Sequence, residues 1–93
     1  MGGLIVVAQL VRITNPTGLD VKPAGILCKE AMKFKCKVTY SYGNGNTANA
    51  KSVLSVLGSS IKYGEEIHLV CDGEDEELAL AHLVACFEKG LED

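Results

Sequence analysis

The fold is decided by residues 15–32, NPTGLDVKPAGILCKEAM. The segment opens with Asn-Pro-Thr-Gly, residue types that reverse the chain and end the element before them. From Pro23 onward, apolar residues recur at three- and four-residue steps, which predicts a helix with one buried stripe. The members of that stripe are Ala24, Leu27, Cys28, Ala31 and Phe34.

Asp20 lies where the N-cap of this helix is expected. Its carboxylate can accept hydrogen bonds from first-turn amides and matches the positive end of the helix dipole. Pro23 would be the third helical residue and has no N–H. We therefore expect the Lys22 amide to donate to Asp20, leaving the amides of Val21 and Ala24 free. A loop leading into such a helix start favours an anion or a phosphate group.

The seven residues from Gly18 to Ala24, read as Gly-Leu-x-x-x-Pro-Ala, resemble the active-site segment of the HPr family. Members of that family are histidine-containing phosphocarrier proteins of the bacterial sugar phosphotransferase system. Their segment reads Gly-Leu-His-Ala-Arg-Pro-Ala, and the histidine passes a phosphoryl group from the first enzyme of the system to sugar-specific acceptors. The resemblance places Asp20 at the histidine position and Lys22 at the arginine position. It implies that phosphotransfer through histidine is absent here.

Three roles for Asp20 remain open at this stage. It can be a plain N-cap. It can accept a phosphoryl group as an acyl phosphate, although no carboxylate cluster that would hold magnesium is visible beside it. Its fixed charge can also partly imitate a phosphorylated site, since a phosphoryl group carries roughly 1.5–2 charges. Lys22 would meet an anion as a point charge rather than as the planar fork of arginine. The two replacements indicate either a relative outside the transfer chain or an altered sequence.

The remaining pattern predicts four strands. Two of them flank Gly43-Asn44-Gly45-Asn46, and Asn-Gly between β-like runs predicts a two-residue hairpin. Gly43-x-Gly45-x-x-Ala48 matches a loose dinucleotide-binding pattern, but the helix which that pattern requires is missing, so we expect no cofactor. In the last strand, Ile67, Leu69 and Cys71 should face the core. The expected strands are Val6–Thr14, Lys37–Tyr42, Asn46–Ala50 and Glu66–Cys71.

Two further helices are expected. The final one should start within Gly73-Glu74-Asp75-Glu76-Glu77, with four acids in its first turn, and its predicted buried stripe is Leu80, Leu83, Val84, Phe87 and Leu91. With a short helix after Ser52, the order is β-α-β-β-α-β-α. This predicts an α+β open-faced sandwich: a four-stranded antiparallel sheet covered on one face by three helices. The HPr family shares this order, and a single domain over residues 1–93 is expected.

Ser52 precedes a short apolar segment that stops at Gly58, which predicts a capped, brief helix. One or two turns cannot bury all its apolar residues, so part of the set should form an exposed docking patch. Lys51-Ser52-Val53-Leu54 resembles the segment around a serine that an ATP-dependent kinase phosphorylates in HPr proteins of Gram-positive bacteria. The modified form binds a transcriptional repressor. The resemblance therefore implies that Ser52 is a phosphorylation site, besides its role as a cap. The expected docking residues are Val53, Leu54 and Leu57.

Composition excludes several classes. The net charge of −3 argues against a dominant basic nucleic-acid surface. The apolar N-terminal run is interrupted by Gln9 and Arg12 and is too short to span a bilayer, so no membrane insertion is expected. The four cysteines have no C-x-x-C spacing and are expected to be reduced core thiols of a cytoplasmic protein. Four lysines near the end of the first helix, Lys29, Lys33, Lys35 and Lys37, are expected to be solvated.

No metal site is expected. His82 and Cys86 lie four residues apart on the last helix and could both touch a metal, but no third ligand has suitable spacing. His68 is expected on the exposed face of the sheet. An enzyme is not expected either, because no acid–base pair and no nucleophile with a base are visible.

The favoured hypothesis is an HPr-like regulatory protein, phosphorylated on Ser52 and docking to other proteins. Its partners would be phosphotransferase-system proteins, or a serine kinase and a transcriptional regulator. The alternative is a stand-alone regulatory domain of the same layout that binds a small ligand in a pocket. The oligomeric state is left open by the sequence.

Overall fold

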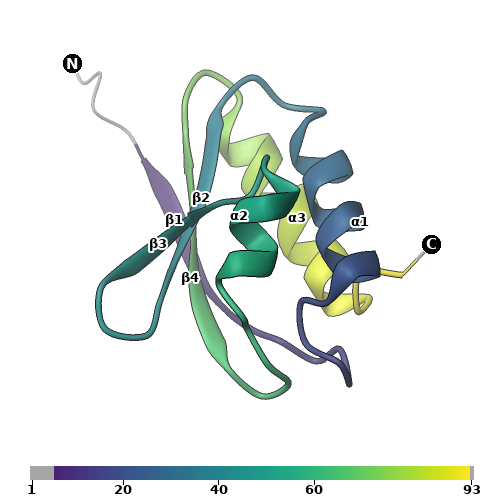
Figure 1. Cartoon of the computed structure of the whole chain (residues 1–93). Helices are drawn as coiled ribbons and strands as arrows, with labels where there is room; N and C mark the ends of the chain where they lie inside the picture. Colours follow the sequence, from purple (N-terminus) through teal and green to yellow (C-terminus); the bar gives the residue numbers. More distant parts are fainter. Residues whose placement is uncertain (1–5, 93) are drawn as a thin grey trace.

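The computed structural model describes residues 6–92. Its four strands form one antiparallel sheet in the order β1-β4-β2-β3. The edge strands are β1 and β3, and β2 pairs with β3, which follows it in the chain. Along the chain, two helices lie between strands and a third follows the last strand (Figure 1). In chain order the elements are β1 (Val7–Arg12), α1 (Val21–Ala31), β2 (Lys37–Tyr42), β3 (Asn46–Asn49), α2 (Val53–Gly58), β4 (Glu66–Asp72) and α3 (Glu76–Glu88).

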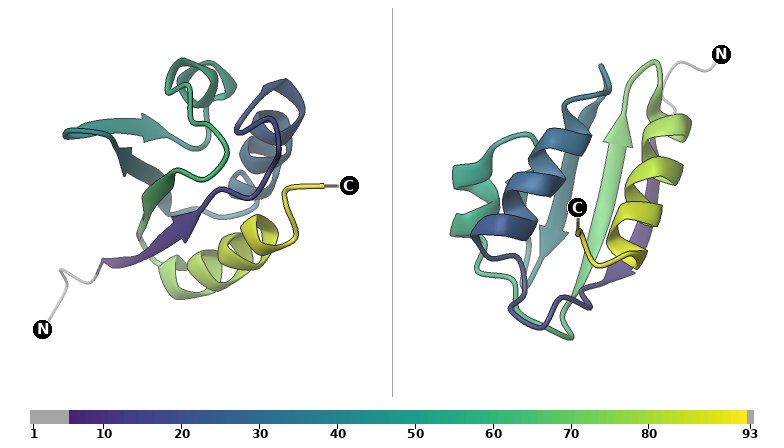
Figure 2. Two further views of the ribbon diagram at one scale, coloured as in Figure 1. Left: turned by 90° about the horizontal axis from the view of Figure 1, so that it is seen from below. Right: turned by 90° about the vertical axis from the view of Figure 1, so that its right-hand side faces the viewer.

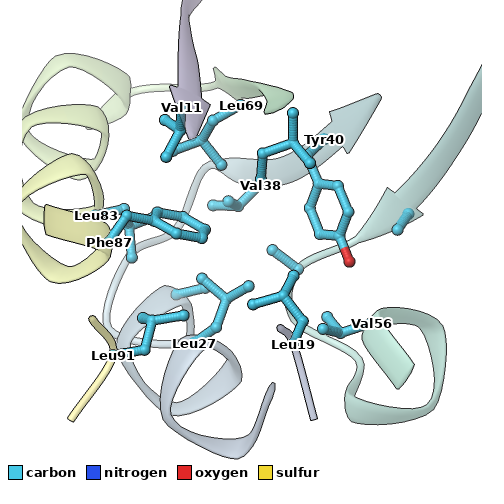
Figure 3. Close-up of a cluster of buried hydrophobic side chains, with 14 of the residues drawn as sticks. Val11, Leu19, Leu27, Val38, Tyr40, Val56, Leu69, Leu83, Phe87 and Leu91 are labelled. Carbon is cyan, nitrogen blue, oxygen red and sulfur yellow. The ribbon is translucent and has the colours of Figure 1, made fainter. Parts of the chain in front are cut away.

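All three helices lie on the same face of the sheet (Figure 2). They cover the face on which the strands place their apolar side chains. In β4, for example, Ile67, Leu69 and Cys71 are buried on this face, while His68 is exposed on the other. The predicted buried and exposed faces of β4 and the α+β open-faced layout are confirmed, although β4 ends one residue later than expected, at Asp72. In the core, side chains of α1, α2 and α3 converge on those of β2 and β4 (Figure 3). The labelled members include Leu27, Val38, Tyr40, Val56, Leu69, Leu83 and Phe87.

The predicted element ends need small corrections. β1 spans Val7–Arg12 rather than Val6–Thr14, although Val11 and Ile13 do face the core. Ile13 continues the pairing beyond β1, because its amide donates to the Glu65 carbonyl at 2.9 Å. Gln9, two residues before Val11 in β1, is exposed. β2 matches its predicted range, whereas β3 ends one residue earlier than expected, at Asn49.

The hairpin between β2 and β3 has a three-residue loop, so the prediction of a two-residue turn is wrong. Tyr42 pairs with Asn46, which leaves Gly43, Asn44 and Gly45 in the loop. Gly43 and Gly45 have φ values of 56° and 88°. Two glycines with positive φ allow the longer loop, which is another common hairpin connection.

The predicted stripes of the helices are partly right. In the first, Ala24, Leu27 and Ala31 are buried, but α1 ends at Ala31, so Phe34 lies beyond it and is half-buried. In the last, Leu83 and Phe87 of α3 and Leu91 after it are buried. Leu80 and Val84 are only half-buried, and their expected place is taken by Ala79, whose short side chain lets α3 approach the sheet.

The start of α3 differs from the prediction in a way that matters for stability. Only Glu76 and Glu77 lie in the first turn, and the Asp75 side chain makes no cap bond to α3. Its carboxylate instead accepts from the amides of Lys35 at 2.9 Å and Cys36 at 3.0 Å. Asp75 therefore ties the start of α3 to the segment that leads into β2.

The Asp75 contact predicts an acid-dependent loss of stability. The Lys35 amide above all, and then the Cys36 amide, hold the pKa of Asp75 below its ordinary value of 3.8. Because the folded state keeps the ionised form, this stabilisation is present above pH 3.8 and is lost as the pH falls through the lower, folded-state pKa. We expect Asp75→Asn to lower stability at pH 7 and to flatten its dependence on pH in the acid range. Urea unfolding across that range measures both effects.

The matched control is Glu74→Gln, which removes the same charge from an exposed side chain of the same loop. It should leave the acid slope as it is in the parent chain. An unchanged slope in Asp75→Asn would mean that the Asp75 contact does not stabilise the fold.

The four cysteines are free thiols, and Cys36 and Cys71 are buried, which agrees with the prediction of core thiols for these two. Cys28 and Cys86 are half-buried. Burial raises the pKa of Cys71 to about 12, so this thiol is protonated at neutral pH. Within residues 6–92, no helix has the length and apolar character needed to cross a membrane.

Candidate functional site

The loop before α1 is held tightly against the segment that follows α2. Gly18 has a φ of 70°, in the left-handed region, and a Cβ built on it would lie 2.8 Å from the Lys62 Cα and in contact with the Ile61 carbonyl oxygen. The neighbouring Leu19 is buried and its amide donates to the same Ile61 carbonyl at 2.9 Å. Glycine is required here both by backbone conformation and by close approach.

Asp20 follows this anchored loop and is the exposed N-cap of α1. Its carboxylate accepts from the Val21 amide at 2.8 Å, and its backbone carbonyl accepts from the Ala24 amide at 2.8 Å. The cap prediction is confirmed, but the expectation that the amides of Val21 and Ala24 are free is wrong. The Ala24 amide makes the ordinary helical bond to the carbonyl four residues earlier, and the Asp20 side chain takes the Val21 amide. Two first-turn amides are thereby already occupied.

Lys22 lies beside Asp20 at the start of α1 and is exposed. The exposed positions of Asp20 and Lys22 place a carboxylate and an ammonium group at the surface, two residues apart in the chain. A partner protein can therefore reach both.

Ser52 caps α2, as predicted. Its Oγ accepts from the Ser55 amide at 3.2 Å, and the Ser55 Oγ in turn accepts from the Asn49 amide at 2.9 Å. Ser52 is half-buried. The two hydroxyls thus hold the turn between β3 and α2 in place, and the Ser52 hydroxyl lies near the surface.

Lys51 positions this turn, a role that the sequence did not reveal. Its Nζ donates to the Phe34 carbonyl at 2.6 Å, and its own carbonyl accepts from the Cys28 thiol at 3.1 Å. Both partners lie more than fifteen residues away in the chain. Because these contacts depend on residues distant in the chain, the sequence around Lys51 does not indicate them.

Asp20 and Ser52 lie near different parts of α1. Leu19 meets Ile61, which follows α2, whereas Cys28 in the middle of α1 meets Lys51, which precedes α2. The two helices therefore run antiparallel and side by side (Figure 1). Asp20 lies near the end of α2 and Ser52 near the middle of α1, so the two do not form one pocket.

The predicted docking residues are exposed to different degrees. Leu54 is 83% exposed, Val53 and Leu57 are half-buried, and Val56 is fully buried in the core. The expectation that part of this set stays at the surface is therefore confirmed. Val21 at the start of α1 is also 67% exposed, a surface residue that the sequence argument did not single out. Exposed apolar side chains on α1 and α2 are what a protein-docking surface requires.

The other residues singled out from the sequence lie elsewhere. The four lysines of the basic stretch are exposed, as expected. Lys33 pairs with Glu30 at 2.9 Å. His82 and Cys86 lie on α3, where the His82 ring is 5.4 Å from that of Phe34 between centroids. A hollow that the sequence did not predict opens at the start of α3 and is lined by residues 72–78 and Ala81, five of which are acidic.

Comparison with known proteins identifies the class. A family model described as "PTS HPr component phosphorylation site" matches residues 7–89. The chain is 39% identical over 77 residues to the phosphocarrier protein HPr of Mycoplasma genitalium, covering 83% of this chain and 88% of that protein. It is 35% identical over 79 residues to the HPr-like protein Crh of Bacillus subtilis, covering 85% and 92%.

A solved structure agrees. The fold superposes on the phosphocarrier protein HPr from Bacillus anthracis with a TM-score of 0.80 and 31% identity, over 86% of this chain and 94% of that one. The fold and the matched phosphorylation-site model define a small phosphocarrier-type protein rather than an enzyme. The chain belongs to the HPr family.

Proposed function

We propose that this HPr-family protein acts as a regulator through phosphorylation of Ser52 and docking to other proteins, and that it does not carry phosphate on residue 20. The observation that carries the proposal is the placement of Ser52. Its hydroxyl caps α2 near the surface, two residues from the 83% exposed Leu54. A kinase and a partner protein would thus meet the same end of α2.

Residue 20 supports the second half of the proposal. A carboxylate stands at the position that the family resemblance equates with the phosphoryl-accepting histidine, and it has no imidazole nitrogen to attack a phosphoryl group. Its Oδ1 is already bound to the Val21 amide. Asp20 thereby supplies a negative charge and a helix cap, both of which persist without any transfer reaction.

The chemistry at Ser52 is ordinary serine phosphorylation. A bond forms between the Ser52 Oγ and the γ-phosphorus of ATP, the bond from that phosphorus to ADP breaks, and the hydroxyl proton passes to a base of the kinase. The phosphate oxygens can replace the hydroxyl as acceptors for the Ser55 amide, 3.2 Å from Oγ in the free protein. The added charge of about −2 would change what the surface around Leu54 binds.

The docking surface is proposed to consist of Val53, Leu54 and Leu57 on α2 with Val21 on α1. The partners are proposed to be proteins of the phosphotransferase system, or a serine kinase and a transcriptional regulator, in the cytoplasm. The alternative function, a stand-alone domain that binds a small ligand, is less well supported, because the family match extends over residues 7–89.

Two separate reactions test the proposal. The protein is incubated with the first enzyme of the system and phosphoenolpyruvate, and separately with the serine kinase and ATP, and each product is weighed by intact-mass spectrometry. We expect one phosphoryl group in the kinase reaction and none in the other. Phosphate gained only in the first reaction would contradict the proposal.

Ser52→Ala and Ser55→Ala form a matched pair for the kinase reaction, because each hydroxyl accepts one backbone amide: the Ser52 Oγ that of Ser55, and the Ser55 Oγ that of Asn49 at the end of β3. Ser52→Ala should take up no phosphate, and Ser55→Ala should be modified as the parent chain is. Equal modification of both variants would place the phosphate on another residue.

A further inference from the structure

Three side chains with metal-binding atoms meet between α1 and α3. His82 and Cys86 lie four residues apart on α3 and therefore face the same side of it. The fold adds Glu30 from α1, whose Oε1 lies 2.6 Å from the His82 Nε2. One carboxylate oxygen, one imidazole nitrogen and the Cys86 sulfur all lie within 4.8 Å of one another. No metal site was expected from the sequence because a third ligand was lacking, and α1 supplies it.

We propose that Glu30, His82 and Cys86 form a zinc site that joins α1 to α3. Carboxylate, imidazole and thiolate are the three ligand types of zinc in proteins, and they suit zinc better than magnesium or calcium, which prefer oxygen alone. Zinc–ligand bonds of about 2.0–2.3 Å place tetrahedral ligand atoms about 3.3–3.8 Å apart. The three ligand atoms lie within 4.8 Å of one another, and the hydrogen bond of 2.6 Å between the Glu30 Oε1 and the His82 Nε2 must give way to bonds to the metal.

The surroundings suit a bound divalent cation. Two negative ligands, the Glu30 carboxylate and the Cys86 thiolate, balance the two positive charges of the metal, and a neutral imidazole adds none. Since the side chains of Glu30 and His82 are 17% and 40% exposed, a cation can enter from solvent and a water molecule can take the fourth position. The Phe34 ring lies against His82 and limits its rotation.

Before a metal binds, the two acidic ligands differ in protonation. The hydrogen bond to His82, and then that to Lys33, hold the pKa of Glu30 below its usual value, so the carboxylate is ionised at neutral pH. Burial raises the pKa of Cys86, so the unbound thiol is neutral. On binding, the sulfur–metal bond forms as the S–H bond breaks, and the proton leaves to solvent. The Lys33 Nζ is 2.9 Å from the Glu30 Oε1. When the metal binds this oxygen, Lys33 must move away or pair with the other carboxylate oxygen of Glu30.

The zinc site is separate from residue 20 at the start of α1. Glu30 lies ten residues beyond Asp20, which along a helix is about 15 Å. α1 and α3 lie side by side over the sheet (Figure 2), so the metal would cross-link two elements that otherwise meet through side-chain packing and the hydrogen bond between Glu30 and His82. The expected consequence is added stability of the folded protein when zinc is present.

Cobalt(II) tests the site because its spectrum reports a sulfur ligand. The fully reduced protein is titrated with Co²⁺ alone and then with Zn²⁺. We expect a thiolate-to-cobalt charge-transfer band that saturates at one equivalent and disappears as zinc replaces cobalt. Cys86→Ser should lose the band. Cys28→Ser, which changes the other half-buried thiol, should keep it.

Two further variants cover the case in which Cys86→Ser does not fold. Glu30→Gln and His82→Gln should each weaken cobalt binding at least about tenfold, while His68→Gln on the opposite face of the sheet should not. Zinc should raise the Tm of the parent chain and not that of Glu30→Gln. Absence of the charge-transfer band in the parent chain, or a band unaffected by the changes at residues 30, 82 and 86, would overturn the proposal.

Discussion

Asp20→His, made together with Lys22→Arg, is expected to convert the protein from a non-acceptor into one that takes a phosphoryl group from the first enzyme of the phosphotransferase system. The reason is that the scaffold around residue 20 is present. Gly18 and Leu19 anchor the loop on Ile61, and residue 20 is exposed at the start of an eleven-residue helix. What the chain lacks is the nucleophilic imidazole and the planar guanidinium that the family segment has at these positions.

The measurement is intact mass after incubation with the first enzyme and phosphoenolpyruvate. It is made in a Ser52→Ala background, so that any phosphate gained cannot be on that serine. The parent chain should gain nothing and the double variant one phosphoryl group, which acid treatment should remove, as expected for phosphohistidine. The expected difference between the parent chain and the double variant is therefore between no phosphoryl transfer and transfer of one phosphoryl group per chain.

Asp20→Asn with Lys22→Arg is the matched control, since it changes the charge at residue 20 without adding an imidazole. It should remain unmodified. If the histidine variant also stays unmodified while folded, the residues at positions 20 and 22 do not account for the absence of transfer, and a difference elsewhere, such as the docking surface, prevents it.

Features set by local periodicity were predictable from the sequence. β2 was placed to the residue, and the inward set of β4 was assigned correctly, because alternating burial is visible in the chain itself. The caps Asp20 and Ser52 were predictable for the same reason, since a cap bonds to amides within a few residues.

Features that depend on residues distant in sequence were not predictable. In the sequence, Asp75 is one of four acidic residues expected in the first turn of the last helix. In the structure its carboxylate accepts from amides 39 and 40 residues away. Glu30 gave no sign of its contact with His82, 52 residues further on. In both cases the sequence shows a charged residue in or directly before a helix, and only the packing of α1, α3 and the segment before β2 decides its partner.

Gly18→Ala is expected to lower the free energy of unfolding by about 2–4 kcal/mol, and Gly25→Ala to raise it by about 0.5–1 kcal/mol. At position 18 the new methyl group meets the Ile61 carbonyl oxygen and the Lys62 Cα, both backbone atoms that cannot rotate away, and the φ of 70° adds strain. At position 25, inside α1, the methyl group meets nothing within 4 Å, so only the gain in helix propensity remains.

Urea unfolding of the two variants beside the parent chain measures the difference, and thermal unfolding should separate their Tm values by more than about 10 °C at this size. The opposite signs exclude a general effect of replacing glycine by alanine. Because the loop that Gly18 anchors also carries Asp20, Gly18→Ala should in addition reduce phosphoryl uptake in the Asp20→His, Lys22→Arg background, whereas Gly25→Ala should not. Equal stability of the two variants would mean that the loop before α1 can move away from Ile61, and that residue 20 is not held in place by it.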